Sequence, residues 1–521
     1  MSANIKASVD GTQAIIGVGG VDQMTVSNAG VVTANSFVGA ISNTNVTATG
    51  STTARTLANR FADVVNVKDF GAVGDGVADD TAAIQAAIDY SNSIGGCIVF
   101  LPEGSYKTSS PINLKPKVFL NGSGTRSTTI VGNGTHSVIS AVGSISNVLA
   151  SGKLSNLTIR GSSKVNTNVK GIEFAWVNRY EICNVEIFQC YIGFYFSNAW
   201  QTKVDNIQIH GAGTDQSYIG FYGAEVDPSN QNNVINAINC IVQGVEKYGF
   251  RLINFNGSKF TNCEALDGEI GFYLGAPIVG TEAIRWGHFS NCLADTNSIT
   301  NWRLERGSAT RFEQCSFSNC WAGNSQYGFR IFDVSQINIS SPLIVGNAAG
   351  MVASIEMNRC ARIVISGGSL LEYATVGIQL NDCQYCNING NHTYSSILPA
   401  THNGFSESGT SNYNIGLGNT FYNGVTVIGA NTNIVRNNGQ GTICEKTGSA
   451  TLLSSATSVV VTHGLSYTPS IDDVRITPRN DITPAVRLWV TNMTSTQFTI
   501  NSNVSPTGNC LISWSINPIR T

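Results

Sequence analysis

Charged side chains are scarce in this sequence: Lys, Arg, Asp and Glu make up only 12% of its 521 residues, and the formal net charge is -3. Without an excess of Lys and Arg, the chain lacks the basic surface that nucleic-acid binding requires. No apolar run approaches the roughly 20 residues of a membrane-spanning helix. The first residues, MSANIKASVDG, have neither the basic nor the apolar region of a signal peptide. We therefore expect folding in a reducing cytoplasm, with no nucleic-acid partner and no membrane contact.

The 13 cysteines are an odd number, and they do not follow a metal-binding pattern. Cys383 and Cys386 form a single CxxC, without a second pair and without histidines at zinc-finger spacing. We predict buried thiols that pack as small apolar side chains, and no metal or other cofactor.

Strand and turn formers dominate the composition. Glycine occurs 54 times and proline 12 times, hydrophobic residues make up 42% of the chain, and Asn, Ser and Thr are common. Such a chain can bury a large core and favours strands and tight turns over helices. The composition predicts an all-β protein.

A short phrase, usually a glycine followed by an alternating strand, recurs between about residues 170 and 390. It reads GFYF, GFRL or GFYL in typical copies, which begin 22 to 30 residues apart. The copies start at Gly171, Gly193, Gly220, Gly249, Gly271, Asn301, Gly328, Gly350 and Gly377. A strand-rich period of this length predicts a β-helix in which each copy belongs to one coil.

A second phrase follows the first, usually 11 residues later, and carries an amide at its third position. These amides are Asn184, Asn206, Asn262, Asn291 and Gln314. The fourth position holds Val185, Ile207, Cys263, Cys292 and Cys315. We predict that the amides stack inside a turn and hydrogen-bond along the axis, beside a buried stack of the fourth-position side chains.

Residues 66–88, NVKDFGAVGDGVADDTAAIQAAI, contain the one helical pattern that stands out. Asp79 or Asp80 can act as the N-cap of a small apolar helix that follows. A stack of coils has an open end with unpaired strand groups, and such an end needs a cover. We predict that this helix caps the N-terminal end of the β-helix.

Residues 65–108 resemble the opening of the pectin-lyase-like right-handed parallel β-helix superfamily, especially phage tailspikes and capsule depolymerases. The coil pattern extends the resemblance to about residue 390. The resemblance implies a right-handed parallel β-helix that acts on a polysaccharide. It does not imply one reaction, because members hydrolyse, eliminate or deacetylate different polysaccharides.

The two ends of the chain differ from the coil pattern. Residues 1–62 resemble leaders that join a spike to a phage tail or baseplate protein, and residues 63–445 hold the β-helix with its cap. Residues 446–521 alternate with period two, which predicts a C-terminal β-sandwich. Similar modules of tailspikes aid trimerisation and sometimes bind sugar. The resemblance thus implies a homotrimer in the virion tail, assembled in the host cytoplasm and acting at the host cell surface.

In each copy of the first phrase the third residue should point outward. This column reads Glu173, Tyr195, Tyr222, Arg251, Tyr273, Arg303, Arg330, Val352 and Gln379. We predict that the polysaccharide binds to its aromatic and cationic members, Tyr195, Tyr222, Arg251, Tyr273, Arg303 and Arg330. The alternatives are a strand face that simply favours aromatics, or one buried against a neighbouring subunit.

Acidic residues lie on loops beside this column, and the catalytic candidates are Asp267, Glu269, Asp295 and Glu246. Two carboxyl groups on adjacent coils can supply the acid and the base or nucleophile of a glycoside hydrolase. Endoglycosidic hydrolysis is therefore the favoured reaction. A lyase that uses Tyr222 or Tyr273 with Arg251 or Arg303, and a non-catalytic carbohydrate-binding adhesin, are the alternatives.

Overall fold

The computed structural model describes residues 3–7, 13–18, 21–27, 32–34, 45–47 and 50–516, except 212, 225–231, 254, 276–283, 307–311, 348–349, 397–402, 412, 423–424, 428–434, 438–445, 466–467, 481–482 and 484–486. Contacts between residues divide the chain into two compact units, Met1–Val65 and Asn66–Thr521. Within the described residues, no helix is long and apolar enough to cross a membrane.

The first unit contains an antiparallel sheet, a short hairpin and one turn of helix. The sheet consists of β1 (Ala3–Ala7), β2 (Gln13–Val18), β3 (Val21–Ser27) and β4 (Val32–Ala34), and the hairpin of β5 (Asn45–Val46) and β6 (Arg55–Thr56). The helix α1 spans Leu57–Phe61 and begins at Thr56, whose side chain accepts a hydrogen bond from the Asn59 backbone. Much of the predicted leader, residues 1–62, lies outside the described residues.

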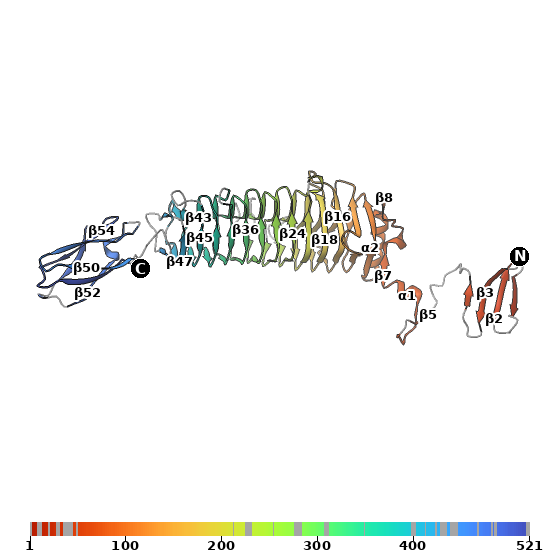
Figure 1. Cartoon of the computed structure of the whole chain (residues 1–521). Helices are drawn as coiled ribbons and strands as arrows, with labels where there is room; N and C mark the ends of the chain where they lie inside the picture. Colours follow the sequence, from red (N-terminus) through yellow and green to blue (C-terminus); the bar gives the residue numbers. More distant parts are fainter. Residues whose placement is uncertain are drawn as a thin grey trace. The chain divides into compact units, whose positions relative to one another are not determined.

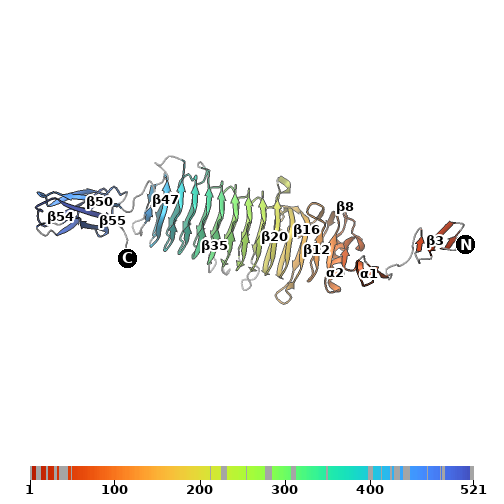
Figure 2. The same cartoon turned by 60° about the horizontal axis from the view of Figure 1, so that its bottom comes forward.

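The second unit contains a right-handed parallel β-helix, seen as a stack of coils in Figures 1 and 2. Within the described residues, its strands form one parallel sheet of 25 strands and another of 18. Strands of the larger sheet used below are β9 (Ile98–Leu101), β12 (Phe119–Gly122), β16 (Lys153–Ser163), β18 (Glu181–Cys190), β20 (Lys203–His210), β24 (Ile241–Gln243), β28 (Glu264–Leu266), β32 (Leu293–Asp295) and β36 (Trp321–Gly323). Strands of the smaller sheet are β17 (Lys170–Asn178), β19 (Ile192–Trp200), β21 (Ile219–Ala224), β25 (Tyr248–Leu252), β29 (Ile270–Gly275), β33 (Thr300–Glu305), β37 (Tyr327–Phe332), β40 (Ala353–Asn358) and β43 (Val376–Asn381).

The two repeated phrases occupy different walls of each coil. The first phrase forms the strands of the smaller sheet, and the second forms a corner of the larger one. In one middle coil, for example, β27 (Lys259–Thr261) meets β28 at Asn262, and the chain then enters β29. The period read from the sequence is therefore the length of one coil.

Stacked aromatic rings fill the core between the two sheets. The rings of Phe250 and Phe272 stack with centroids 4.5 Å apart, and those of Phe272 and Trp302 lie 4.1 Å apart. Each of these side chains is fully buried. They are second residues of the first phrase, so its alternation is confirmed there, with the second residue inside.

The corner asparagines stack as predicted, but they lie outside the core. The Asn206 Nδ2 atom donates to Asn184 Oδ1 at 2.9 Å, and Asn262 donates to Asn239 at 3.3 Å. The side chains of Asn184, Asn206 and Asn262 are exposed, and their φ angles are 51° to 53°. The predicted burial is wrong because the left-handed backbone of this tight corner, which suits asparagine, turns its side chain outward.

The register of the fifth predicted amide is also wrong. Strand β31 (His288–Ser290) pairs with β35 (Cys315–Ser318) so that Ser290 lies opposite Ser318. Asn319 therefore follows Asn291 in the corner, and its Nδ2 atom donates to Asn291 Oδ1 at 3.4 Å. Gln314 occupies another turn, because the phrase FEQC repeats the letters of the corner one strand too early.

The thiol stack behind this corner consists of Cys240, Cys263, Cys292 and Cys320, each at most 1% exposed. Cys320 takes the place predicted for Cys315, which is buried elsewhere in the core. Every described cysteine is a free thiol, which agrees with packing as a small apolar side chain.

The predicted cap is the helix α2 (Thr81–Ser93) at the first coils of the stack (Figure 1). It buries Ile84, Ala87 and Ile88. Both candidate N-cap residues bind the local backbone: Asp79 accepts from Thr81 N, whereas Asp80 accepts from Val73 N and Gly74 N. Asp80 thus closes the turn before the helix.

The C-terminal strands form two three-stranded antiparallel sheets around a core of their own. One sheet has the order β50 (Lys446–Leu452), β55 (Cys510–Ile516) and β52 (Val474–Pro478). The other has the order β51 (Ser458–Thr462), β54 (Gln497–Ser502) and β53 (Leu488–Thr491). This is the predicted β-sandwich, built around Phe498 and Trp514 with ring centroids 5.4 Å apart.

Candidate active site

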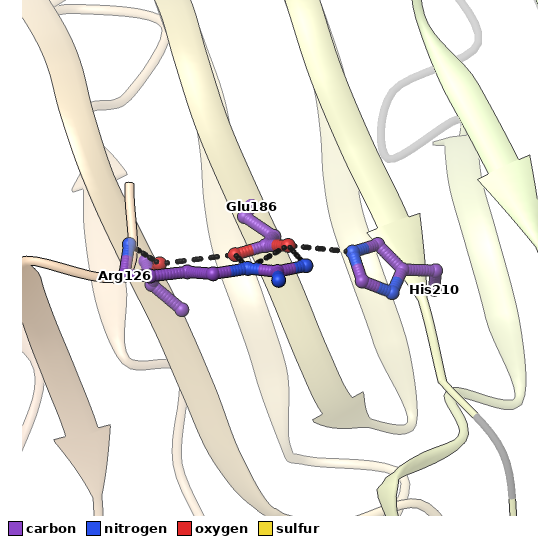
Figure 3. A network of polar contacts seen from close by, with 4 residues as sticks. Arg126, Glu186 and His210 are labelled. Carbon is purple, nitrogen blue, oxygen red and sulfur yellow. Dashed lines mark hydrogen bonds and ion pairs between the residues drawn. The ribbon is translucent and has the colours of Figure 1, made fainter. Parts of the chain in front are cut away.

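A buried carboxylate lies between a guanidinium group and an imidazole on the outer face of the larger sheet (Figure 3). Glu186, on β18, has a side chain that is 4% exposed. Its Oε1 atom lies 2.7 Å from Arg126 Nη2 and 2.7 Å from His210 Nε2. Thr158 also donates to Oε2 at 3.3 Å. Side chains from successive coils thus meet at one carboxylate.

The surroundings of Glu186 keep it ionised. Burial by itself raises the pKa of this carboxyl group, but hydrogen bonds from Arg126 and His210 and their charges outweigh burial, so the pKa lies below its usual value. An ionised Glu186 accepts a hydrogen bond from His210 Nε2 and thereby orients the ring. The pair can therefore hold or move a proton at His210, whose side chain is 26% exposed.

Three hollows lie on the outer surface of the larger sheet, the first on the strand segments before the asparagine corner and the other two on the segments after it. The first, of about 730 Å³, is lined by residues of β9, β12, β16 and β18. The second, of about 420 Å³, contains Arg126 and Glu186 and shares Asn156 and Asn184 with the first. The third, of about 590 Å³, is lined by His210 and Asp267, and the Glu186–His210 contact joins it to the second. We call these three hollows the groove.

The predicted ladder of aromatic and cationic residues lies on the other, smaller sheet. Its members stand in register on adjacent coils, as in Tyr195–Tyr222 and Arg251–Tyr273. They contact one another along the axis: the Arg251 guanidinium lies 4.7 Å from the Tyr222 ring centre, and that of Arg303 5.8 Å from the Tyr273 ring centre. Arg330 instead lies 4.1 Å from the ring of Tyr327. The structure thus brings the six predicted binding residues together.

One rung of the ladder differs from the sequence reading. Glu356 of β40 lies opposite both Arg330 and Gln379, and it forms an ion pair with Arg330. Val352 precedes the strand, because Ser354 takes the position that glycine holds in the other copies. The ladder also has little exposed area at Tyr273, which is only 7% exposed.

The predicted catalytic acids fall into two groups. Asp267 and Asp295 lie on adjacent coils at one corner: Thr296 Oγ1 donates to Asp267 at 2.6 Å, and Thr296 N donates to Asp295 at 2.8 Å. Glu269 and Glu246 each pair with a lysine, Lys247 at 2.7 Å and Lys164 at 3.4 Å. Among the four, Asp267 is the residue that lines the groove.

Comparisons with known proteins agree with this architecture. A family model described as "Rhamnogalacturonase A/epimerase, pectate lyase-like" matches residues 64–265. In structure, the A-module of mannuronan C-5 epimerase AlgE6 from Azotobacter vinelandii has a TM-score of 0.55 and 20% identity, covering 72% of this chain and 98% of its own. The solenoid is a right-handed parallel β-helix, and its first part is similar to the pectate lyase-like family model.

Two further relatives show how far the likeness extends. Mannuronan C5-epimerase AlgE5 of Azotobacter vinelandii is 50% identical over 72 residues, which are 12% of this chain and 7% of that protein. The tailspike gp61 of Pseudomonas phage phi297 has a TM-score of 0.50 and 13% identity, and covers 88% of this chain and 100% of its own. At these structural identities the likeness shows the fold alone, a right-handed parallel β-helix.

Sequence reasoning missed the three residues at the centre of the groove. Arg126, Glu186 and His210 belong to different coils, and only the register of the larger sheet brings them together. For Glu186 a signal existed, because it is the fifth residue of the second phrase, a position on the outer face of the sheet; Arg126 and His210 lie outside that column. Within the part of the chain that the structure describes, no cluster of His, Cys, Asp or Glu could hold a metal.

Proposed function

We propose that the protein is a phage tailspike that binds a bacterial surface polysaccharide along the groove and cleaves it. The observation that carries this proposal is the hydrogen bond between Glu186 and His210 in an elongated hollow. A buried, ionised carboxylate that orients a partly exposed imidazole can support proton transfer. The groove spans several coils, each rising about 4.8 Å, so several sugar units fit along it.

The Arg126–Glu186–His210 group favours elimination. With Nε2 protonated and donating to Glu186, His210 Nδ1 is the proton acceptor of the neutral ring. It would remove the proton beside a uronate carboxylate. Arg126, whose side chain is 74% exposed, would neutralise that carboxylate as charge develops. The electrons of the broken C–H bond form the double bond, the bond from the neighbouring carbon to the glycosidic oxygen breaks, and that oxygen takes a proton from protonated His210 or from water. The epimerase relatives support this route, because their names place their chemistry at a sugar C5.

Hydrolysis is the second candidate, and the Asp267–Asp295 corner favours it. Carboxylates on adjacent coils can lie about 5 Å apart, as a retaining glycoside hydrolase requires, and the side chain and backbone of Thr296 link Asp267 and Asp295. Under this proposal one carboxyl group protonates the leaving oxygen and the other attacks the sugar.

Assembly follows from the same proposal. We expect a homotrimer in the virion tail, attached to a tail or baseplate protein through residues 1–62 and acting at the host cell surface. The tailspike among the structural neighbours supports this assignment through its printed name.

The test measures reducing ends and unsaturated uronate absorbance released from purified bacterial polysaccharides. Glu186→Gln should lower cleavage at least about a hundredfold while binding persists, because the amide keeps the shape but cannot stabilise a protonated His210. Glu264→Gln is the matched control, since Glu264 stands three coils further on the same outward column. Release of reducing ends without uronate absorbance would indicate hydrolysis. In that case Asp267→Asn should abolish the release. Binding without either product would indicate an adhesin.

A further inference from the structure

The first hollow of the groove has an apolar floor in an otherwise polar surface. Phe119 of β12 is 41% exposed and Ile98 of β9 is 40% exposed, and the two residues are direct partners in the sheet. Both line the hollow of about 730 Å³. An exposed aromatic ring at the edge of a hollow can pack against the C–H face of a sugar ring.

The corner amides form a row of hydrogen bonds in which each side chain donates to the next one toward this floor. Asn206 donates to Asn184, Asn184 to Asn156, and Asn156 to Asn121, over 2.8 to 2.9 Å. Ser155 also donates to Asn121 Oδ1, at 2.8 Å. Because each amide polarises the next, the Nδ2 group at the end of the row is a strengthened donor. That end, Asn121, lines the hollow beside Phe119.

The charges around the hollow are predominantly positive. Lys153 and Arg179 line it, with Glu181 as the acidic group. Lys153 and Lys203 approach Glu181 at 3.3 Å and 3.6 Å, and Lys203 also lies 3.6 Å from Asp205, so two lysines and Arg179 face two carboxylates. Arg179 bonds the neutral amide of Gln201 and keeps its full charge. The electrostatic potential of the hollow therefore favours the binding of an anionic group.

We infer that this hollow is a subsite for an acidic sugar unit of the polysaccharide. Phe119 packs against the apolar face of the ring, Asn121 donates to a hydroxyl, and Arg179 with Lys153 receives the carboxylate. The subsite lies two coils before Glu186, on the order of 10 Å along the axis, and on the other side of the asparagine corner that the two hollows share. This inference rests on the proposed function, because it places the chain in the same groove as the cleavage point.

The test uses the full chain with Glu186→Gln, so that ligands are bound but not cleaved. The probes are oligomers of polymannuronate and polygalacturonate, with neutral dextran oligomers for comparison, measured by titration calorimetry. Adding Phe119→Ala should weaken binding of an acidic oligomer by at least about fivefold, whereas Phe119→Trp should retain it. Arg179→Ala should reduce the preference for acidic over neutral oligomers. Phe61→Ala, the same change at a residue that is 73% exposed in α1, should alter nothing.

Three results overturn the subsite: unchanged binding in Phe119→Ala, equal binding of acidic and neutral oligomers, or binding of none of the probes. The same measurements distinguish failure of the subsite from failure of the proposed function. If the parent protein cleaves a polysaccharide but Phe119→Ala leaves acidic binding unchanged, cleavage stands and the subsite is wrong. If Phe119→Ala loses binding in a protein whose parent never cleaves, the subsite stands and the depolymerase is wrong.

Discussion

Gly249 lies so close to Gly271 on the next coil that a β-carbon on Gly249 would be 2.6 Å from the Gly271 carbonyl oxygen. The same β-carbon would be 2.8 Å from the Cβ atom of Ala265. The first phrase thus begins with glycine because coils approach closely there.

Gly249→Ala should destabilise the solenoid by about 1–3 kcal/mol, because the added methyl group forces backbone atoms of two coils apart. Urea unfolding followed by circular dichroism measures the change. Gly508→Ala is the matched control, since a β-carbon there meets nothing within 4 Å. Equal unfolding free energies of the two variants would show that neighbouring coils can move apart at Gly249 without cost.

The corner asparagines give a second prediction. Asn262 has φ of 51° and an exposed side chain, so Asn262→Leu places a branched side chain in the left-handed region and removes one amide contact. We expect a loss of about 1–3 kcal/mol in unfolding free energy. Asn262→Gly should cost less, because glycine adopts this backbone readily. If the two variants unfold alike, backbone strain has no part in the choice of asparagine.

These two positions show what the sequence could and could not predict. The repeat and the opening signature were enough for the coil, the cap and the inner face of most strands of the smaller sheet, with the Val352 copy as the exception. The side on which Asn262 lies was not readable, because a corner residue with positive φ does not follow the alternation of a strand. The Glu186 site was harder still. Its partners are 60 residues away at Arg126 and 24 away at His210, so their meeting depends on the lengths of every intervening coil.

Asp79 gives a prediction for acid stability. Its carboxylate accepts hydrogen bonds from the side chains of Ser109 and Thr81, which lower its pKa from 3.8 to about 2. A lowered folded-state pKa contributes stability above the unfolded value, and this contribution disappears as the pH falls from 3.8 through about 2.

Asp79→Asn should therefore remove part of the acid sensitivity near the cap. Denaturant unfolding at about pH 6 and again near pH 2.5 should show the parent losing more stability than Asp79→Asn over this interval. Parallel losses would mean that Asp79 titrates normally in the folded protein.

The ladder on the smaller sheet gives the last prediction, because its Tyr222 is half-buried between Arg251 and Tyr195 whereas Tyr273 is almost completely covered. If the ladder holds the polysaccharide away from the cleavage point, Tyr222→Ala should weaken adsorption about three- to tenfold. Turnover at saturating substrate should not change, since Glu186 and His210 lie on the other sheet. Tyr222→Phe keeps the ring and should adsorb like the parent.

Adsorption is measured by pull-down of labelled polysaccharide, with molar mass from light scattering in parallel. Normal adsorption together with a smaller mass for Tyr222→Ala would instead identify the ladder as a contact between subunits, and normal values of both would leave it as internal packing between coils.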